Sequence, residues 1–221
     1  MTSFPFECHR HLFSIEFNLE SNHKIMGFIS FLSCFLIAFG PSIALLFLYI
    51  GRKPRLLLLS LGSAFIWTIT IMSLSIVWYL IPNLSPISLI ITSTVFQEST
   101  KILEYYILKK INNTLDSISS NSHFNSLHHS FAIGYGTGFM SALVHFINPL
   151  AQTTGPGILT CQACPSTNVF FIGAIITLLF TLLNITWTII SFDGFKKGHW
   201  LQFLYVIVNH ALASYYNVHW I

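Results

Sequence analysis

Long runs of apolar residues recur along the chain, with short polar segments between them. Each run is about as long as the roughly 17–25 residues that a helix needs to cross a bilayer. The six runs cover residues 27–50, 56–81, 87–108, 130–150, 169–192 and 200–216. This pattern predicts an all-α fold, a polytopic transmembrane helical bundle with six spans. We assign residues 26–221 to the bundle and residues 1–25 to an amino-terminal extension, which we expect to be disordered.

Two features modify this pattern. Gly40-Pro41 lies in the middle of the first run, and we expect a kink there because proline removes a helical hydrogen bond. The third and fourth runs contain polar residues and are weaker by hydropathy. The longest connection, residues 109–129, is rich in Asn, Ser and His, and we predict a mobile cytoplasmic loop.

Composition favours a membrane protein over a soluble one. The chain is 53% hydrophobic and 8% charged, whereas soluble domains carry about 25% charged residues. The polar connections are short, so no separate soluble domain fits between the runs. No internal repeat is evident in the sequence, and the inverted repeats of many transporters are therefore not indicated.

The basic residues between the runs predict an orientation. They lie in alternate connections, at Arg52, Lys53, Arg55, Lys109, Lys110, Lys196 and Lys197. The other two connections, residues 82–86 and 151–168, contain no Lys or Arg. Basic connections mark the cytoplasmic side of a membrane protein. The amino terminus is therefore predicted to be lumenal or extracellular.

The longer of the two connections predicted to be lumenal, residues 151–168, contains a Cys-x-x-Cys pair, Cys161 and Cys164. A zinc site needs two further ligands at suitable spacing, and the sequence shows none. We expect a local disulfide or two free thiols, and we predict no metal and no cofactor.

The third run places Gln97, Glu98, Lys101 and Glu104 at membrane depth. Charged side chains in a bilayer are costly and tend to pair inside a bundle. The i, i+3 spacing allows Lys101 to pair with Glu98 or with Glu104 on the same helix. We expect Glu104 to snorkel toward the cytoplasmic end of the helix, whereas Glu98 lies deeper.

Two histidines, His145 and His210, also lie within runs. A histidine in lipid needs a hydrogen-bond partner, so each marks a helix contact or a polar cavity, or, less commonly, a proton relay or a metal site. An aspartyl intramembrane protease needs two membrane-embedded aspartates. The only aspartates, Asp116 and Asp193, lie at or beyond predicted helix ends, so no catalytic set is complete.

The fourth run contains a glycine motif at residues 134–138. Gly134 and Gly138 are four residues apart, on one face of a helix, and Ala142 extends that face. Small residues at this spacing let two helices approach closely in lipid. The pattern is equally compatible with packing inside this chain's own bundle and with docking of a partner's helix.

Many short motifs occur in a specific order along the chain. They are Met26-Gly27, Ala38-Phe39-Gly40-Pro41, Ala64-Phe65 with Trp67, Val77-Trp78, Gln97-Glu98 with Lys101, Tyr105-Tyr106, Leu108-Lys109-Lys110, the outer glycines Gly134 and Gly138, Asn148, Gly155-Pro156-Gly157, Phe192-Asp193 and His210. Together, these motifs closely resemble those of the anterior-pharynx-defective subunit of gamma-secretase, over most of the chain.

The resemblance implies a non-catalytic scaffold subunit with a lumenal amino terminus. It implies three partners, nicastrin, presenilin and presenilin enhancer, and presenilin supplies the catalytic aspartates. Such a subunit supports intramembrane proteolysis of type I membrane proteins such as Notch and amyloid precursor protein. It is embedded in lipid in the endoplasmic reticulum, Golgi and plasma membrane, and no nucleic acid is expected.

The chain departs from the family pattern in three places. Asn184 stands where the family has the first of two histidines, and we expect Asn184 to hydrogen-bond with His210. The middle of the glycine motif, Tyr135-Gly136-Thr137, also differs. Only six runs are present, whereas the family has seven spans.

We therefore predict that the chain is a helical scaffold of the gamma-secretase complex. The residues expected to support helix packing and assembly are Gly134, Gly138, Glu98, Lys101, Asn184 and His210. The alternative is an independent multi-pass transporter or channel, because intramembrane charges often line a pathway.

Overall fold

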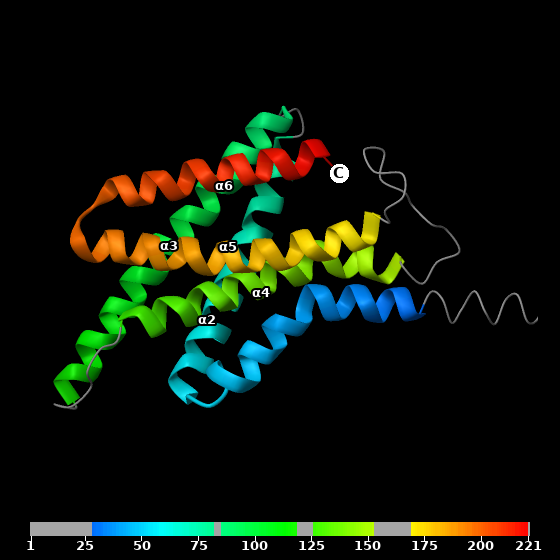
Figure 1. The fold of residues 1–221 in the computed structure, drawn as a ribbon. Coiled ribbons are helices and arrows are strands. Elements are labelled where there is room, and N and C mark those ends of the chain that lie inside the picture. Colours follow the sequence, from blue (N-terminus) through cyan, green and yellow to red (C-terminus); the bar gives the residue numbers. More distant parts are fainter. Residues whose placement is uncertain (1–27, 82–84, 119–125, 153–168, 221) are drawn as a thin grey trace, which may run out of the picture.

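The structure is a computed structural model that describes residues 28–81, 85–118, 126–152 and 169–220 (Figure 1). Within these ranges all regular structure is helical, so the predicted all-α class is confirmed. Two predictions, the amino-terminal extension at residues 1–25 and the Cys161–Cys164 pair, lie outside the described residues.

Six helices follow one another in the described ranges. The first helix covers Phe28–Ile50, and its last turn, η1 (Leu46–Ile50), is a π-helix. The others are α2 (Pro54–Leu80), α3 (Pro86–Ile118), α4 (Ser126–Gln152), α5 (Val169–Lys197) and α6 (Trp200–Trp220). Four of them, the first helix, α2, α4 and α5, are long and apolar enough to cross a membrane. The chain is therefore a multi-pass membrane protein.

The two less apolar helices, α3 and α6, pack against each other. The third and fourth runs were predicted to be weaker by hydropathy, and this is confirmed: α3 is not among the four apolar helices, and α4 has the lowest mean hydropathy of the four, 1.3. The sequence did not predict that α6 would also be less apolar. The physical reason is that α6 carries Asn209 and His210 at its middle, and α3 carries the charged residues. Because His210 of α6 forms a hydrogen bond with Glu98 of α3, neither helix has to be uniformly apolar.

The long connection between the third and fourth runs is mostly helical. Residues 109–129 were predicted to form a loop, but α3 continues to Ile118 and α4 already begins at Ser126. Ile111, Leu115 and Ile118 are spaced i, i+4 and i+7, which is a helical period that the Asn and Ser content obscured. The prediction of a loop is wrong for both ends of this segment.

Five helices form a ring in which each helix contacts the next. The contacts join α2 to α4, α4 to α5, α5 to α6, α6 to α3 and α3 back to α2. Figure 1 shows α4 and α5 side by side along their length, while the α2–α3 hairpin crosses them at a steep angle. The first helix packs outside this ring, where Ala38 and Phe39 contact a cluster with Ala142 and Phe146 of α4. It changes direction partway along (Figure 1), in agreement with the kink expected near Pro41.

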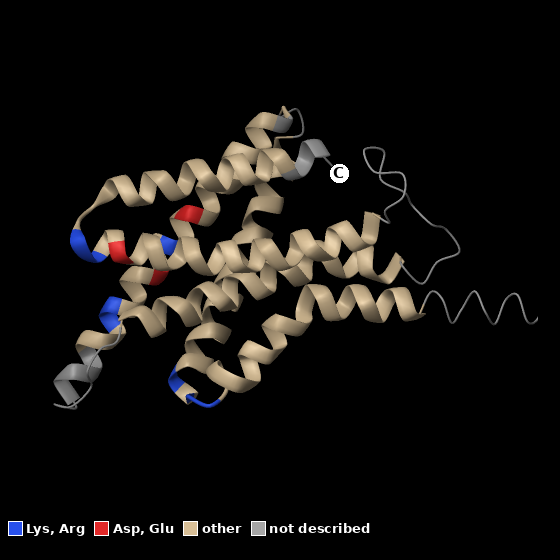
Figure 2. Cartoon of the chain, viewed as in Figure 1, with Lys and Arg blue, Asp and Glu red and all other residues tan. Residues whose placement is uncertain are grey.

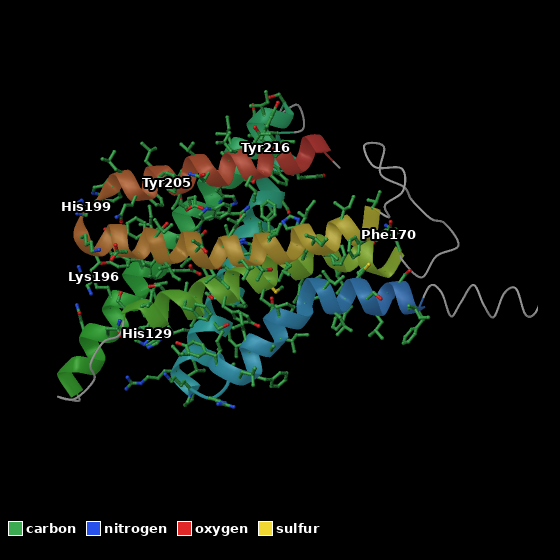
Figure 3. All side chains as sticks on the ribbon, viewed as in Figure 1. His129, Phe170, Lys196, His199, Tyr205 and Tyr216 are labelled. Atoms are coloured by element: carbon green, nitrogen blue, oxygen red, sulfur yellow. The ribbon has the colours of Figure 1, made fainter. Side chains whose placement is uncertain are left out.

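Helices α5 and α6 are joined by a tight turn. Gly198 has φ 74°, a left-handed conformation that glycine adopts at little cost. The His199 N–H donates to the carbonyl of Gly194 at 2.9 Å, which is the six-to-one bond of a Schellman cap. Lys196 and His199 lie at this turn (Figure 3).

The basic residues of the connections gather at one end of the bundle. Figure 2 shows the described Lys and Arg residues, apart from Lys101, near the α5–α6 turn, the distal part of α3 and the turn before α2. We call this the basic end. The basic end agrees with the sequence, in which the basic residues lie in alternate connections, because every second connection between spans lies on the same side of a membrane.

Candidate functional site

The outer glycines of the motif in α4 bring α4 into close contact with α5. A Cβ atom at Gly134 would lie 2.8 Å from the Cα of Ile185, and one at Gly138 would lie 2.9 Å from the backbone oxygen of Thr181. Side chains larger than hydrogen therefore do not fit at either position without moving α5. These two glycines are packed within the chain's own bundle, which is one of the two alternatives that the spacing allowed.

The middle glycine of the motif, Gly136, packs against α2 and not against α5. A Cβ atom at Gly136 would overlap the Ser60 oxygen and the Ser63 hydroxyl of α2, and would lie 2.9 Å from the Ser60 carbonyl carbon. The Ser63 hydroxyl donates to the Ile133 carbonyl of α4 at 3.0 Å. Ser60 and Ser63, three residues apart, form the small-residue face of α2 that receives α4.

Tyr135 extends these contacts to the first helix. Its ring is almost fully buried, and its hydroxyl donates to the backbone carbonyl of Ser42 at 2.9 Å. The sequence marked Tyr135-Gly136-Thr137 only as a departure from the family motif. In the structure, α4 uses this stretch to contact two helices that the outer glycines do not reach.

A buried polar cluster joins α3, α5 and α6. Lys101 Nζ lies 2.6 Å from Glu98 Oε1, and His210 Nδ1 lies 2.7 Å from the same oxygen. The three residues are at most 5% exposed. Of the two pairings that the spacing allowed Lys101, the one with Glu98 is formed, and His210 has the hydrogen-bond partner that a histidine in lipid requires.

Trp187 of α5 covers this cluster from one side. Its indole stacks on the His210 ring with centroids 4.6 Å apart and an interplanar angle of 24°. Lys101 Nζ lies 5.6 Å from the centroid of the same indole, within the range of a cation–π contact. The sequence offered no signal for Trp187, because its role depends on three helices meeting.

Glu104 does not snorkel as predicted. Its side chain is 3% exposed, and neither carboxylate oxygen has a hydrogen-bond partner among the described residues. The physical reason is that α3 extends to Ile118, so Glu104 lies well inside the helix and not near its end. It occupies the same buried face of α3 as Glu98 and Lys101.

A cavity of about 500 Å³ lies among α2, α3, α4, α5 and α6, and His210 of the polar cluster is part of its wall. Among the residues that line it are Gln97, His145, Asn184 and His210. Of the roles considered for His145, the structure shows the place in a polar cavity: His145 lines this partly polar wall. Asn184 also packs against the glycine motif, since a Cβ atom at Gly138 would lie 3.1 Å from the Asn184 Cβ.

The hydrogen bond expected between Asn184 and His210 is not formed. The Asn184 amide donates to the Phe180 carbonyl of its own helix at 3.0 Å, and His210 bonds with Glu98. The physical reason is that Glu98, on α3, approaches His210 from the neighbouring side of the ring. An ionised carboxylate is also the stronger acceptor for a ring N–H.

Comparison with known proteins places these features in one family of sequences. Residues 29–219 match the family model described as Aph-1 protein. The gamma-secretase subunit APH-1B of Homo sapiens is 30% identical over 196 residues, which cover 83% of this chain and 76% of that protein. The gamma-secretase subunit APH1-like protein of Arabidopsis thaliana is 32% identical over 191 residues, covering 81% and 76%. The gamma-secretase subunit Aph-1 of Drosophila melanogaster is 29% identical over 189 residues, covering 83% and 78%.

Proposed function

Because this chain belongs to the Aph-1 family, we propose that it is a non-catalytic scaffold subunit of a gamma-secretase complex. It stabilises presenilin and nicastrin, assembles with presenilin enhancer, and supports intramembrane proteolysis of type I membrane proteins such as Notch and amyloid precursor protein. The observation that carries this proposal is the match over nearly the whole described chain to relatives named as gamma-secretase subunits.

The arrangement of the buried acids supports a non-catalytic role. An aspartyl protease needs two carboxyl groups close enough to share a proton. Here Glu98 is bonded to Lys101 and His210, and Glu104 lies beyond Lys101 along the same helix. Lys101 thus separates the two acids in the sequence and is paired with one of them. This arrangement suits structural charge pairing rather than acid–base chemistry.

The packing residues suit a scaffold whose shape must be fixed before partners bind. Gly134 and Gly138 hold α5 against α4, and Asn184 lies in that contact. Glu98, Lys101 and His210 join α3 to α6. In the proposal, these six residues support assembly indirectly, because they set the positions of the exposed apolar faces on which partner helices dock.

The orientation and location follow from the same proposal. The basic end faces the cytoplasm, the amino terminus is lumenal or extracellular, and the subunit resides in the endoplasmic reticulum, Golgi and plasma membrane. The exposed apolar side chains of the outer helices contact lipid or partner helices.

The proposal predicts that no carboxyl group of this chain takes part in the cleavage reaction. Cells that lack the endogenous subunit are supplied with the wild-type chain or with Glu104→Gln, and release of the cytoplasmic fragment of a type I substrate is measured. We expect the variant to restore cleavage to within about twofold of wild type per assembled complex, because the amide only replaces a buried carboxyl group.

Asp193→Asn is the matched control, because Asp193 is an exposed acid that pairs with Lys197 at 2.7 Å. Assembly is followed in parallel by the amount of presenilin that co-purifies with the tagged chain. A Glu104→Gln complex that assembles in normal amount but does not cleave substrate would contradict the non-catalytic role.

A further inference from the structure

The cavity in the ring has hydrogen-bonding side chains from all five helices that surround it. They are Trp78 of α2, Gln97 of α3, Ser141 of α4, Asn184 of α5 and His210 of α6. The cavity of about 500 Å³ is within the size range of pockets that hold drug-sized molecules. The rest of the wall is mainly apolar. A cavity of this size and mixed chemistry is suited to an amphipathic occupant.

His210 presents one defined ring nitrogen for such an occupant. Lys101 pairs with Glu98 as a carboxylate, and a carboxylate can only accept a hydrogen bond. His210 Nδ1 must therefore be the donor in its 2.7 Å contact with Glu98. In neutral histidine, Nε2 then carries a lone pair, and no side chain of the described helices occupies it. Stacking on Trp187 holds the ring in this orientation.

The cavity wall has no formal charge to attract an ion. Among the residues that line it there is no Asp, Glu, Lys or Arg. Its polar groups are hydroxyls, amides, an indole and imidazoles, which recognise groups that both donate and accept hydrogen bonds. The buried indole N–H of Trp78 also lacks a partner within the described part of the chain. A buried donor without a partner calls for an explanation, and an occupant that supplies an acceptor provides one.

We propose that this cavity is a binding site for an uncharged lipid with a polyhydroxyl head, in the manner of a monoacylglycerol. The head lies among Gln97, Asn184 and His210, where one hydroxyl donates to His210 Nε2. The acyl chain follows the apolar wall formed by residues such as Leu74 and Ile176. The bilayer around the helices is the source of this ligand, because uncharged amphiphiles concentrate there.

The test uses a monoacylglycerol with a diazirine in its acyl chain as the probe. The full chain is purified in mild detergent with the proteins that accompany it, the probe is photoactivated, and labelled peptides are identified by mass spectrometry. We expect labels on the cavity-lining parts of α2 and α5, and we expect excess unlabelled monoacylglycerol to remove them. Labelling only at lipid-facing positions, or labelling that the competitor does not reduce, would overturn the proposal.

A matched pair of variants separates specific binding from a change in folding. Ser93 lines the cavity, and Ser99 is exposed on the same helix. Both hydroxyls donate to backbone carbonyls of α3. Ser93→Leu fills part of the cavity, and we expect it to lower cavity labelling about tenfold, whereas Ser99→Leu leaves labelling unchanged. Equal labelling of both variants would refute the site, and normal co-purification of presenilin with Ser93→Leu would leave the scaffold proposal intact.

Discussion

Replacing Gly136 with alanine is expected to destabilise the chain more than any other single-methyl addition among its described glycines. The new Cβ would overlap the backbone oxygen of Ser60, and backbone atoms cannot rotate away as a side chain can. Helix α2 must therefore move off α4, which breaks the Ser63 hydrogen bond to Ile133. We expect a cost of about 3 kcal/mol or more, seen as a fall of about 10 °C in the thermal unfolding midpoint in detergent.

Three other glycines provide a graded comparison. At Gly134 and Gly138 the added Cβ would lie 2.8 Å and 2.9 Å from its nearest neighbours, so we expect smaller losses than at Gly136. At Gly62, an exposed position of α2, the Cβ would meet nothing within 4 Å. Gly62→Ala should leave the midpoint unchanged or slightly raised, because alanine favours a helix over glycine. Equal midpoints for Gly136→Ala and Gly62→Ala would show that α2 does not pack on α4 as described.

Replacing Lys101 with methionine is expected to have the second large effect. Lys101 is 3% exposed and is the ammonium partner of Glu98, while Glu104 is buried one helical turn further along the same face. Removal of the lysine leaves two buried carboxyl groups with only His210 to balance them. Breaking a buried ion pair by removing one partner costs roughly 3–5 kcal/mol. We expect the unfolding midpoint to fall by about 10 °C or more.

A double-mutant cycle tests the cause of this loss. Glu98→Gln combined with Lys101→Met removes both charges, so the double variant should lose less stability than Lys101→Met alone. The exposed pair of Lys197 with Asp193 has a similar contact distance of 2.7 Å, with side chains 56% and 42% exposed. Lys197→Met should therefore cost less than about 1 kcal/mol. Additive losses in the buried cycle would contradict a coupled pair.

The parts of the site that sequence could predict are those set within one helix. The i, i+3 spacing predicted that Lys101 could pair with Glu98 or with Glu104, and the structure shows the pair with Glu98. The need of His210 for a partner was also predictable from its place in an apolar run. The identity of that partner was not, because Glu98 reaches His210 only when α3 lies beside α6. Local periodicity does not encode which helices are neighbours.

Gly136 and Glu104 show two different reasons for a missed prediction. A motif defined by glycines four residues apart describes one helix face, and Gly136 lies on another face that becomes significant only when Ser60 and Ser63 of α2 are adjacent. Glu104 was placed near a helix end because the polar segment after Lys110 concealed the continuation of α3 to Ile118. Hydropathy marks the end of an apolar run, and a helix can continue beyond it.

Isolating the chain together with its partners shows whether it is a scaffold subunit of a gamma-secretase complex. A tagged chain is expressed at its natural level, extracted from membranes in mild detergent, and its stable companions are quantified by mass spectrometry. We expect presenilin and nicastrin in amounts close to that of the chain itself. Recovery of the chain as a folded, monodisperse protein without either of them would contradict it.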